Sequence, residues 1–354
     1  MTRSEETLRF QRPDGTTVEA VVAERRDDPL PPSAPLTACR LVLEYADGTR
    51  QDVRHIAPPD RGAGGTRVGP DRELDAAYAA LDNEILAGVR LSRFREPHPH
   101  PPSVSRLVGY DADGVRPYAL LEPYRGRCVG AGSRILPGER ARFQESLLTG
   151  LRWIGAAGIA HRALGPDSVH WDGSEAQITD FTSAAPLGVP REVAGAPPWQ
   201  APEQRPGGTA GTVTDRDDVW AAGRLIFFVI TGTEPTGPDR LADDPELARV
   251  LAGVFGPPEH RPAVRELLAR IGVADPIPRI PPPDAALQRG RDDFYTHRAY
   301  KHPETAARPV PEAPRTAGPS APSWTPPSGP VPNPAPTGWV PAAPARRRKR
   351  RFGR

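Results

Sequence analysis

The sequence predicts an α+β protein, and three patterns along the chain support this fold class. Four segments have the length and the polar–apolar alternation of half-buried strands. They are 40–45, 50–56, 105–110 and 116–121. Apolar residues recur at helical spacing in 71–91 and 264–271, and 225–230 is a continuous apolar run. From residue 303 onward the chain is rich in proline and poor in large apolar residues, so we expect a disordered tail after a folded body.

Turn residues separate the predicted strands. Asp47-Gly48 and Asp113-Gly114 each lie between two of them. Aspartate and glycine tolerate the backbone conformations of tight turns, so each pair of strands is expected to form a hairpin. A third hairpin is expected around Asp172-Gly173.

Several short motifs follow one another in the second half of the chain. Residues 161–168 read HRALGPDS and residues 180–182 read DFT. Residues 195–203, 218–223 and 258–262 read GAPPWQAPE, DVWAAG and PEHRP. One such motif alone is a weak indication, but several in a fixed order are much harder to obtain by chance. In this order they resemble the catalytic core of the Ser/Thr protein kinases, from H-R-D-L-x-x-x-N and D-F-G to A-P-E and the motifs that follow it.

The resemblance implies a two-lobed protein-kinase-like fold. A small β-rich N-lobe with one αC-type helix would span 1–121, and a larger, mainly α-helical C-lobe would span 122–272. A proline-rich and short helical extension at 273–302 and a disordered proline-rich tail at 303–354 would follow. A body of this size can bury a substantial core without disulfides.

The resemblance also implies that catalytic groups are missing. Ala163 lies where the family has the aspartate that accepts the proton of the substrate hydroxyl, and a methyl group cannot accept a proton. Ser168 replaces the asparagine that binds the second Mg²⁺, and a neutral hydroxyl is a weaker ligand for a hard cation. Asp167 is a nearby alternative base, but in the family fold this position points away from the substrate. We therefore expect no intact catalytic residue.

Lysine is scarce, because Lys301 and Lys349 are the only two in the chain and both follow the last motif. The strand position that binds the ATP phosphates in the family therefore falls on Arg54 or, one residue later, on His55. Arginine can bind phosphate but is not equivalent to lysine. Glu84 falls at the αC glutamate, with Arg54 as its best partner. The alternatives are an ordinary surface strand that carries a basic residue and a solvated helix glutamate.

The phosphate-binding glycine loop has no counterpart at its expected place. Residues 27–35 lie there and read DDPLPPSAP. Proline has no N–H to donate, and aspartate repels phosphate. The glycine-rich segment 62–69 follows a later strand, and we interpret it as a flexible connection.

Some positions that bind the nucleotide in the family carry suitable groups in this chain. Asp180 is a full-strength ligand that could hold one Mg²⁺. The carbonyl of Glu122 and the N–H of Tyr124 fall at the hinge, where they could hydrogen bond to adenine. Thr182 replaces the glycine of D-F-G and favours one backbone conformation. The sequence therefore leaves weak binding of ATP and Mg²⁺ as an open alternative. The expected function requires no cofactor.

Other motif residues are expected to have structural roles. They are His161, Arg162, Phe181, Glu203, Asp218 and Arg261. In the family, the last of these is the buried ion-pair partner of Glu203. Segment 184–194 contains no Ser, Thr or Tyr, so Arg162 has no loop phosphate to bind, and Glu192 is the expected substitute anion.

Composition limits the remaining possibilities. Cys39 and Cys128 are too few for a metal site or a disulfide framework, and no apolar run approaches the roughly 18 residues of a membrane span. Residues 346–354 read RRRKRRFGR, and removing these seven charges from the net charge of +2 leaves −5 for the rest of the chain. Such a tail can bind an acidic membrane surface, nucleic acid or an acidic protein, or simply keep the chain soluble.

Two functions remain open, because a fold alone does not settle function. The first is a pseudokinase, inactive or strongly impaired, that acts as a scaffold or regulator in phosphorylation-linked signalling. It would bind protein partners in the cytoplasm, with peripheral membrane contact through the basic tail as an alternative. The second is an active but divergent ATP-dependent Ser/Thr protein kinase whose rearranged site uses Asp180 and Arg54. The missing catalytic groups favour the first.

Overall fold

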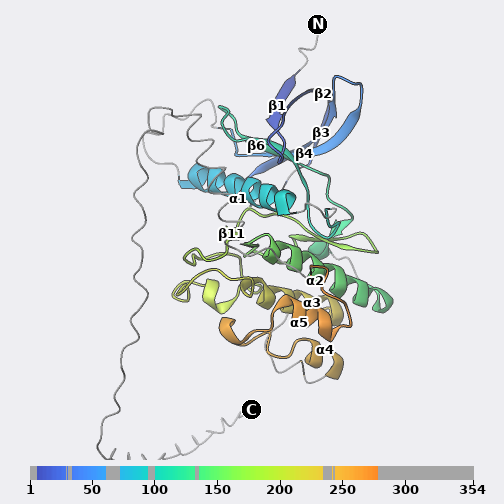
Figure 1. Cartoon of the computed structure of the whole chain (residues 1–354), viewed down its shortest axis with the longest axis vertical. Coiled ribbons are helices and arrows are strands. Elements are labelled where there is room, and N and C mark those ends of the chain that lie inside the picture. The colour runs from blue at the N-terminus through green and yellow to red at the C-terminus, as the bar shows by residue number, and fades with distance from the viewer. Residues whose placement is uncertain are drawn as a thin grey trace, which may run out of the picture. The chain divides into compact units, whose positions relative to one another are not determined.

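Strands dominate the N-terminal part of the chain and close into a barrel. The structure is a computed structural model that describes residues 6–28, 30, 34–60, 72–94, 100–131, 135–233, 241 and 244–277. The barrel strands are β1 (Thr7–Gln11), β2 (Thr17–Asp27), β3 (Thr37–Glu44), β4 (Arg50–Ala57), β5 (Leu107–Asp111) and β6 (Tyr118–Leu121). Their order is β1-β2-β3-β4-β6-β5, with antiparallel neighbours, and β1 pairs with β5 to close the barrel. Figure 1 shows these strands at the end of the molecule where the chain begins.

Alternating apolar residues and a tight turn explain the β3–β4 hairpin. Leu41 and Leu43 of β3 are 1% and 0% exposed, so every second side chain of this strand faces the barrel core. The turn uses Gly48 with a φ of 81°, a value that favours glycine. The Asp47 carboxylate accepts the N–H of Thr49 at 2.9 Å and fixes the turn.

Helix α1 (Arg72–Phe94) packs against the barrel with one apolar face. Ala77, Leu81 and Ile85 of this helix are buried in one cluster with Ile56 of β4 and Leu121 of β6. Their four-residue spacing places them on one side of the helix. In Figure 1, α1 lies between the barrel strands and α2 (Arg140–Ala156).

Helices dominate the remainder of the described chain. Besides α2 they are α3 (Asp217–Thr231), α4 (Pro245–Val250) and α5 (Val264–Arg270), with short 3₁₀ turns at Val129–Ala131, Pro137–Glu139, Pro202–Gln204 and Pro258–His260. Phe143 and Leu147 of α2 and Leu225 of α3 are 0% exposed and belong to the largest apolar cluster. This core therefore holds the long helices together below α1.

Two small sheets carry the segments that contain the motifs. One has the order β10-β9-β7, formed by Ala176–Ile178, Val169–Trp171 and Arg127–Cys128, and the other pairs β11 (Ala185–Pro186) with β8 (Ile159–Ala160). The loop 161–168 runs from β8 to β9, and the segment 179–184 runs from β10 to β11. Both connections leave the same two sheets, and Thr179 donates its N–H to the carbonyl of Ser168 at 2.9 Å. The sheets therefore place the two motifs side by side.

The α+β class predicted from the sequence is confirmed. The predicted strands and helices match β3 to β6, β9, β10, α1, α3 and α5, with ends that differ by a few residues. No range was predicted for β1 or β2; in β2 charged residues interrupt the alternation toward the end of the strand. The glycine-rich segment 62–69 and the predicted tail lie outside the described residues. None of the helices in the described ranges combines the length and the apolar character that a membrane crossing requires.

Candidate functional site

The buried carboxylate of Asp218, at the start of α3, fixes the loop 161–168. It accepts the backbone N–H of His161 at 2.6 Å and that of Arg162 at 2.7 Å. Hydrogen bonds to a charged acceptor are stronger than neutral ones. They help hold Arg162 at a φ of 67°, which is uncommon for a residue other than glycine.

His161 links this loop to the segment that follows β10. Its Nε2 lies 2.9 Å from the carbonyl oxygen of Thr179, and its Nδ1 accepts the N–H of Ala163 at 3.3 Å. These contacts fit the neutral tautomer with the proton on Nε2. The imidazole also packs on Phe181, with ring centroids 4.9 Å apart. The structure therefore brings together the structural residues predicted in both motifs.

Ser168 and Asp167, the polar side chains that follow Ala163 in this loop, contact other groups in and around the loop. The Ser168 hydroxyl accepts the N–H of Gly165 at 3.0 Å and lies 3.3 Å from the carbonyl oxygen of Ala163. Ser168 is only 4% exposed, so its hydroxyl closes the loop on itself. The exposed Asp167 lies against Gly130, because a Cβ at that glycine would be 2.6 Å from its Oδ1.

Asp180 is exposed, and two contacts hold the segment around it. Its backbone has a φ of 62°, and its Oδ1 accepts the Thr182 hydroxyl at 2.6 Å. The carbonyl of Thr182 in turn accepts the side-chain N–H of Asn83 at 2.8 Å. A residue held in the sparsely populated left-handed region needs such support. The segment 180–182 is thus fixed to α1.

Glu84 of α1 is buried and makes the second contact with this segment. It is 3% exposed and accepts the N–H of Phe181 at 2.6 Å. Burial, together with the nearby charge of Asp180, raises the pKa of Glu84 to about 8. At neutral pH this carboxyl group is therefore mostly protonated.

Among the described residues Arg54 forms an ion pair with Asp28 and none with Glu84, although its charge still acts on the Glu84 carboxyl group. The Nε of Arg54 lies 3.0 Å from Oδ2 of Asp28, although the contact lacks hydrogen-bond geometry and leaves Nε without a partner. The central carbon of the guanidinium lies 4.4 Å from the ring centroid of Tyr124, a cation–π distance. Asp28 belongs to the segment at the place of the glycine loop. A carboxylate therefore lies beside the cation that was expected to pair with Glu84.

His55, the other candidate for the lysine position, has different neighbours. It stacks on Tyr118, with ring centroids 4.9 Å apart. Burial, followed by repulsion from Arg25, lowers the pKa of His55 to about 4, so it is neutral at pH 7. Neighbouring residues of a strand point to opposite faces, and Arg54 is the one beside the predicted site.

The predicted hinge residues differ in what they contact. The Glu122 carboxylate pairs with Arg106 at 2.9 Å. Within the described ranges, neither the Glu122 carbonyl nor the Tyr124 N–H has a hydrogen-bond partner. The Tyr124 ring lies 5.0 Å from that of His170 on β9, measured between centroids. Burial, and then the charges of Glu84 and Asp180, raise the pKa of the Tyr124 phenol.

An ion pair joins two of the later motifs near the start of α3. Arg261 is 2% exposed and forms a two-pronged ion pair with Glu203, in which Nη2 lies 2.8 Å from Oε2. It also donates from Nε to the carbonyl of Gly256 at 3.0 Å. Buried charges are tolerated when they are paired in this way.

The segment 184–194 makes other contacts than the predicted ion pair between Arg162 and Glu192. Arg162 donates to the carbonyl of Glu192 at 2.8 Å, so the expected ion pair with its carboxylate is not formed. Instead Arg191 forms two hydrogen bonds of 2.9 Å with Asp217, which is 1% exposed. Sequence reasoning missed this pair, although Asp217 directly precedes Asp218 and its motif.

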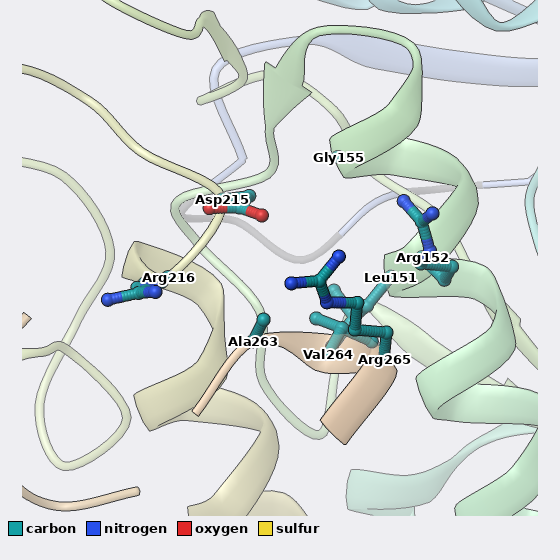
Figure 2. A pocket seen from close by; sticks show the side chains of 8 residues that line it. All are labelled: Leu151, Arg152, Gly155, Asp215, Arg216, Ala263, Val264 and Arg265. Atoms are coloured by element: carbon teal, nitrogen blue, oxygen red, sulfur yellow. The ribbon is translucent and has the colours of Figure 1, made fainter. Parts of the chain in front are cut away.

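A pocket of about 240 Å³ lies apart from these residues. Figure 2 shows its lining, which is Leu151, Arg152, Gly155, Asp215, Arg216, Ala263, Val264 and Arg265. Two of its arginines already bind other residues of the chain. Arg152 pairs with Asp275 at 2.8 Å, and Arg216 donates to the carbonyl of Glu259 at 2.7 Å. No residue of the predicted site lines it, so it is not the candidate catalytic site.

The chemistry available to the described site is limited. No group of three or more His, Cys, Asp or Glu side chains that could hold a metal ion occurs among the described residues. Asp180 could provide one ligand to Mg²⁺, with the others supplied by a nucleotide and water. Ser168 does not fit a second metal position, because its hydroxyl is used within the loop. The described site can thus bind and position groups, but it presents no base at Ala163.

Comparison with known proteins gives a consistent set of relatives. The chain is 33% identical over 162 residues to "Inactive serine/threonine-protein kinase PLK5" of Mus musculus, which covers 44% of this chain and 25% of that protein. It is 28% identical over 225 residues to "Serine/threonine-protein kinase SRK2D" of Arabidopsis thaliana, covering 58% and 56%. It is also 28% identical over 152 residues to "Serine/threonine-protein kinase pkn2" of Myxococcus xanthus, covering 38% and 18%. The chain thus spans little more than half the length of these relatives at most, and no protein-family model matches it.

Proposed function

We propose that this chain, a member of the protein-kinase-like superfamily, is a pseudokinase that acts as a scaffold or regulator in phosphorylation-linked signalling. In this proposal the barrel and α1 correspond to the N-lobe, and the helix-rich part corresponds to the C-lobe. Asp218 still holds the loop 161–168 through two hydrogen bonds. The positions of the catalytic aspartate and the metal-binding asparagine carry Ala163 and Ser168 instead. The mouse relative is inactive by its name, and the same state is part of our proposal for this chain.

The observation that carries the proposal is the ion pair of Arg54 with Asp28, at 3.0 Å. The resemblance assigns to Arg54 the position that holds the ATP phosphates. A carboxylate already faces this cation and also lies 3.6 Å from Nε of Arg40, and Arg54 is only 8% exposed. A phosphate group would have to displace Asp28 or bind against its repulsion. Tight phosphate binding at this position is therefore unfavourable.

The missing base alone would leave a slow enzyme. Loss of a general base typically costs roughly 10² to 10⁴ in rate. The loss of a free phosphate-binding cation and of the second metal ligand affects the same transferred group, so these effects are not independent. Phosphoryl transfer depends mostly on positioning and electrostatic stabilisation, which are the contributions removed here.

The proposal has consequences for ligands and partners. We expect weak or absent binding of ATP and Mg²⁺ and no required cofactor; any binding would use Asp180 and the hinge atoms of Glu122 and Tyr124. The partners would be proteins that recognise the kinase-like body in the cytoplasm. The basic cluster 346–354 lies outside the described residues, and we propose that it contacts an acidic membrane surface, nucleic acid or an acidic protein.

An active but divergent ATP-dependent Ser/Thr protein kinase is the second candidate, and one observation favours it. The Asp180 carboxylate is exposed, and its segment is fixed to α1 by Asn83 and Glu84. A metal ligand is thus presented in a defined position. This candidate requires that Arg54 leave Asp28 when a nucleotide binds, and that a base come from elsewhere.

Phosphotransfer measured with radiolabelled ATP and general protein substrates tests the proposal. We expect the same signal from the wild-type protein, from Asp180→Asn and from a blank. Transfer above the blank that Asp180→Asn abolishes would overturn the pseudokinase assignment. Thermal denaturation with millimolar MgATP is the companion measurement, because a ligand at a hundred times its Kd stabilises by about 2.7 kcal/mol. The pseudokinase assignment predicts no Mg²⁺-dependent shift at millimolar nucleotide, because any binding there is too weak to stabilise the protein measurably.

A further inference from the structure

The pocket shown in Figure 2 lies where α2, the approach to α3 and the start of α5 meet. Leu151 of α2 and Val264 of α5, which are 3% and 5% exposed, form its apolar wall. Its volume of about 240 Å³ is below the roughly 300 to 1,000 Å³ of pockets for drug-sized ligands. This space holds about eight water molecules at about 30 Å³ each. The pocket therefore suits a ligand with few non-hydrogen atoms.

Gly155 leaves space on the side of the pocket next to Asp215. It lies near the end of α2, where glycine is less favourable than other residues because it loses more conformational freedom on folding. A Cβ at this position would lie 3.2 Å from the Cβ of Asp215, which is closer than most side-chain contacts. Any larger residue would therefore press on Asp215 and narrow the pocket.

Two opposite charges in the lining have no partner among the described residues. They are the guanidinium of Arg265 and the carboxylate of Asp215, and both residues are exposed. Within the described ranges their side chains form no hydrogen bond or ion pair, with each other or with another residue. Figure 2 shows the Arg265 guanidinium directed from α5 toward the side of the pocket where Asp215 lies. The pocket thus presents one cation and one anion beside an apolar wall.

The other two arginines of the lining bind elsewhere. Arg152 donates two hydrogen bonds to the carboxylate of Asp275, at 2.8 and 2.9 Å. The charge of Arg265 also acts on Asp275, but both oxygens of this carboxylate already accept from Arg152. Arg216 donates to the carbonyl of Glu259 at 2.7 Å and points away from Arg265 in Figure 2. Arg265 and Asp215 are therefore the charges available to a ligand.

We propose that this pocket binds a free α-amino acid with a small aliphatic side chain. The ligand carboxylate binds the guanidinium of Arg265, whose planar fork matches carboxylate geometry. The ligand ammonium binds Asp215, and the aliphatic side chain packs against Leu151 and Val264.

Charge distinguishes this ligand class from simpler ones. A simple anion is repelled by Asp215, and a simple cation is repelled by Arg265. The end of a peptide chain carries only one of the two charges, whereas a free amino acid carries both. None of the predicted kinase-like site residues lines the pocket, so the proposal does not depend on whether the chain transfers phosphate.

Calorimetric titration of the full chain with L-valine tests the proposal, because two analogues each lack one charged group. Isovalerate lacks the ammonium, and isobutylamine lacks the carboxylate. We expect L-valine to bind with a Kd in the millimolar range or tighter. Each analogue should bind about tenfold or more weakly, because a hydrogen bond between charged groups is lost.

Two variants remove the charges from the protein side. Arg265→Gln and Asp215→Asn should each weaken L-valine binding by about tenfold or more. Both residues are exposed, so these variants should fold and melt as the wild-type protein does. Glu266→Gln is the matched control, because Glu266 is exposed on the same helix and does not line the pocket. It should bind L-valine with wild-type affinity.

Three results would contradict the proposal. One is the absence of L-valine binding to the wild-type protein at millimolar concentration. Another is isovalerate binding as tight as that of L-valine, which would indicate a site for carboxylates in general. The third is equal L-valine affinity of the wild-type protein and of folded Arg265→Gln or Asp215→Asn. If either variant fails to fold, the comparison of L-valine with its two analogues on the wild-type protein decides.

Discussion

Replacement of Glu84 by glutamine should flatten the pH dependence of stability. Burial beside Asp180 raises the pKa of Glu84 from 4.5 to about 8 in the folded protein. The unfolded chain releases this proton near pH 4.5, whereas the folded protein keeps it up to about pH 8. The free energy of unfolding therefore falls as the pH rises between these values, by up to about 1.4 kcal/mol per pH unit. Below and above this window the contribution is constant.

The expected size follows from the pH interval that is sampled. Between pH 5.5 and 7.5 the wild-type protein should lose about 2 to 3 kcal/mol through this group. For a domain of this size, 1 kcal/mol corresponds to about 2 to 4 °C in Tm, so the loss is roughly 5 to 10 °C. Glutamine keeps an oxygen acceptor for the Phe181 N–H but cannot titrate, so Glu84→Gln should not show this part of the loss.

Thermal melting at a series of pH values, followed by tryptophan fluorescence, measures the effect. The quantity compared is the difference in Tm between the variant and the wild type at each pH. Glu73→Gln removes an exposed carboxylate from the same helix and should follow the wild-type curve. Wild-type and Glu84→Gln curves that run parallel from pH 5.5 to 7.5 would refute the reasoning, because Glu84 would then be ionised across this range or equally protonated in both states.

Three further outcomes are expected. Asp28→Asn leaves the β4 guanidinium without its anion and should destabilise by about 1 to 3 kcal/mol in urea denaturation, whereas the exposed Asp27→Asn should change stability by less than about 0.5 kcal/mol. Glu203→Gln leaves its buried arginine partner uncompensated and should cost about 3 to 5 kcal/mol, measured in the same way; an effect below about 1 kcal/mol would contradict this. The combined variant Ala163→Asp and Ser168→Asn should still transfer no radiolabelled phosphate, and restored transfer would show that these two groups alone explain the inactivity.

The backbone arrangement of the candidate site could be predicted from the sequence motifs. His161, Asp218 and Glu203 lie in motifs whose order along the chain is informative, because neighbouring strands and helix starts bring them together. The α+β class was predictable for the same reason, since alternation and helical spacing reflect which side of each element is buried. The protein-kinase resemblance was confirmed by the known proteins to which the chain is similar.

The contacts that decide the chemistry could not be predicted. The approach of Asp28 to Arg54 depends on the path of an irregular segment, and no periodic pattern encodes such a path. The direction of the Tyr124 side chain is set by packing, so the sequence indicated only its backbone N–H. Two aspartates in the segment 27–35, upstream of a strand with a basic residue, were the one available signal of the ion pair. The domain boundaries and the roles of the site residues remain predictions.

The position of strand β1 in the barrel affects how other proteins can bind to it. It pairs with β2 along Thr7–Gln11 and with β5 where Gln11 meets Tyr110, so the barrel closes at the end of this strand. This closure limits the length of edge on which a partner could add a strand of its own, a common mode of peptide capture and of edge-to-edge aggregation. Proteins that bind to the outside of the barrel would contact its exposed side chains, which include several arginine–carboxylate pairs. Such associations should weaken as the salt concentration rises, because salt screens exposed charges.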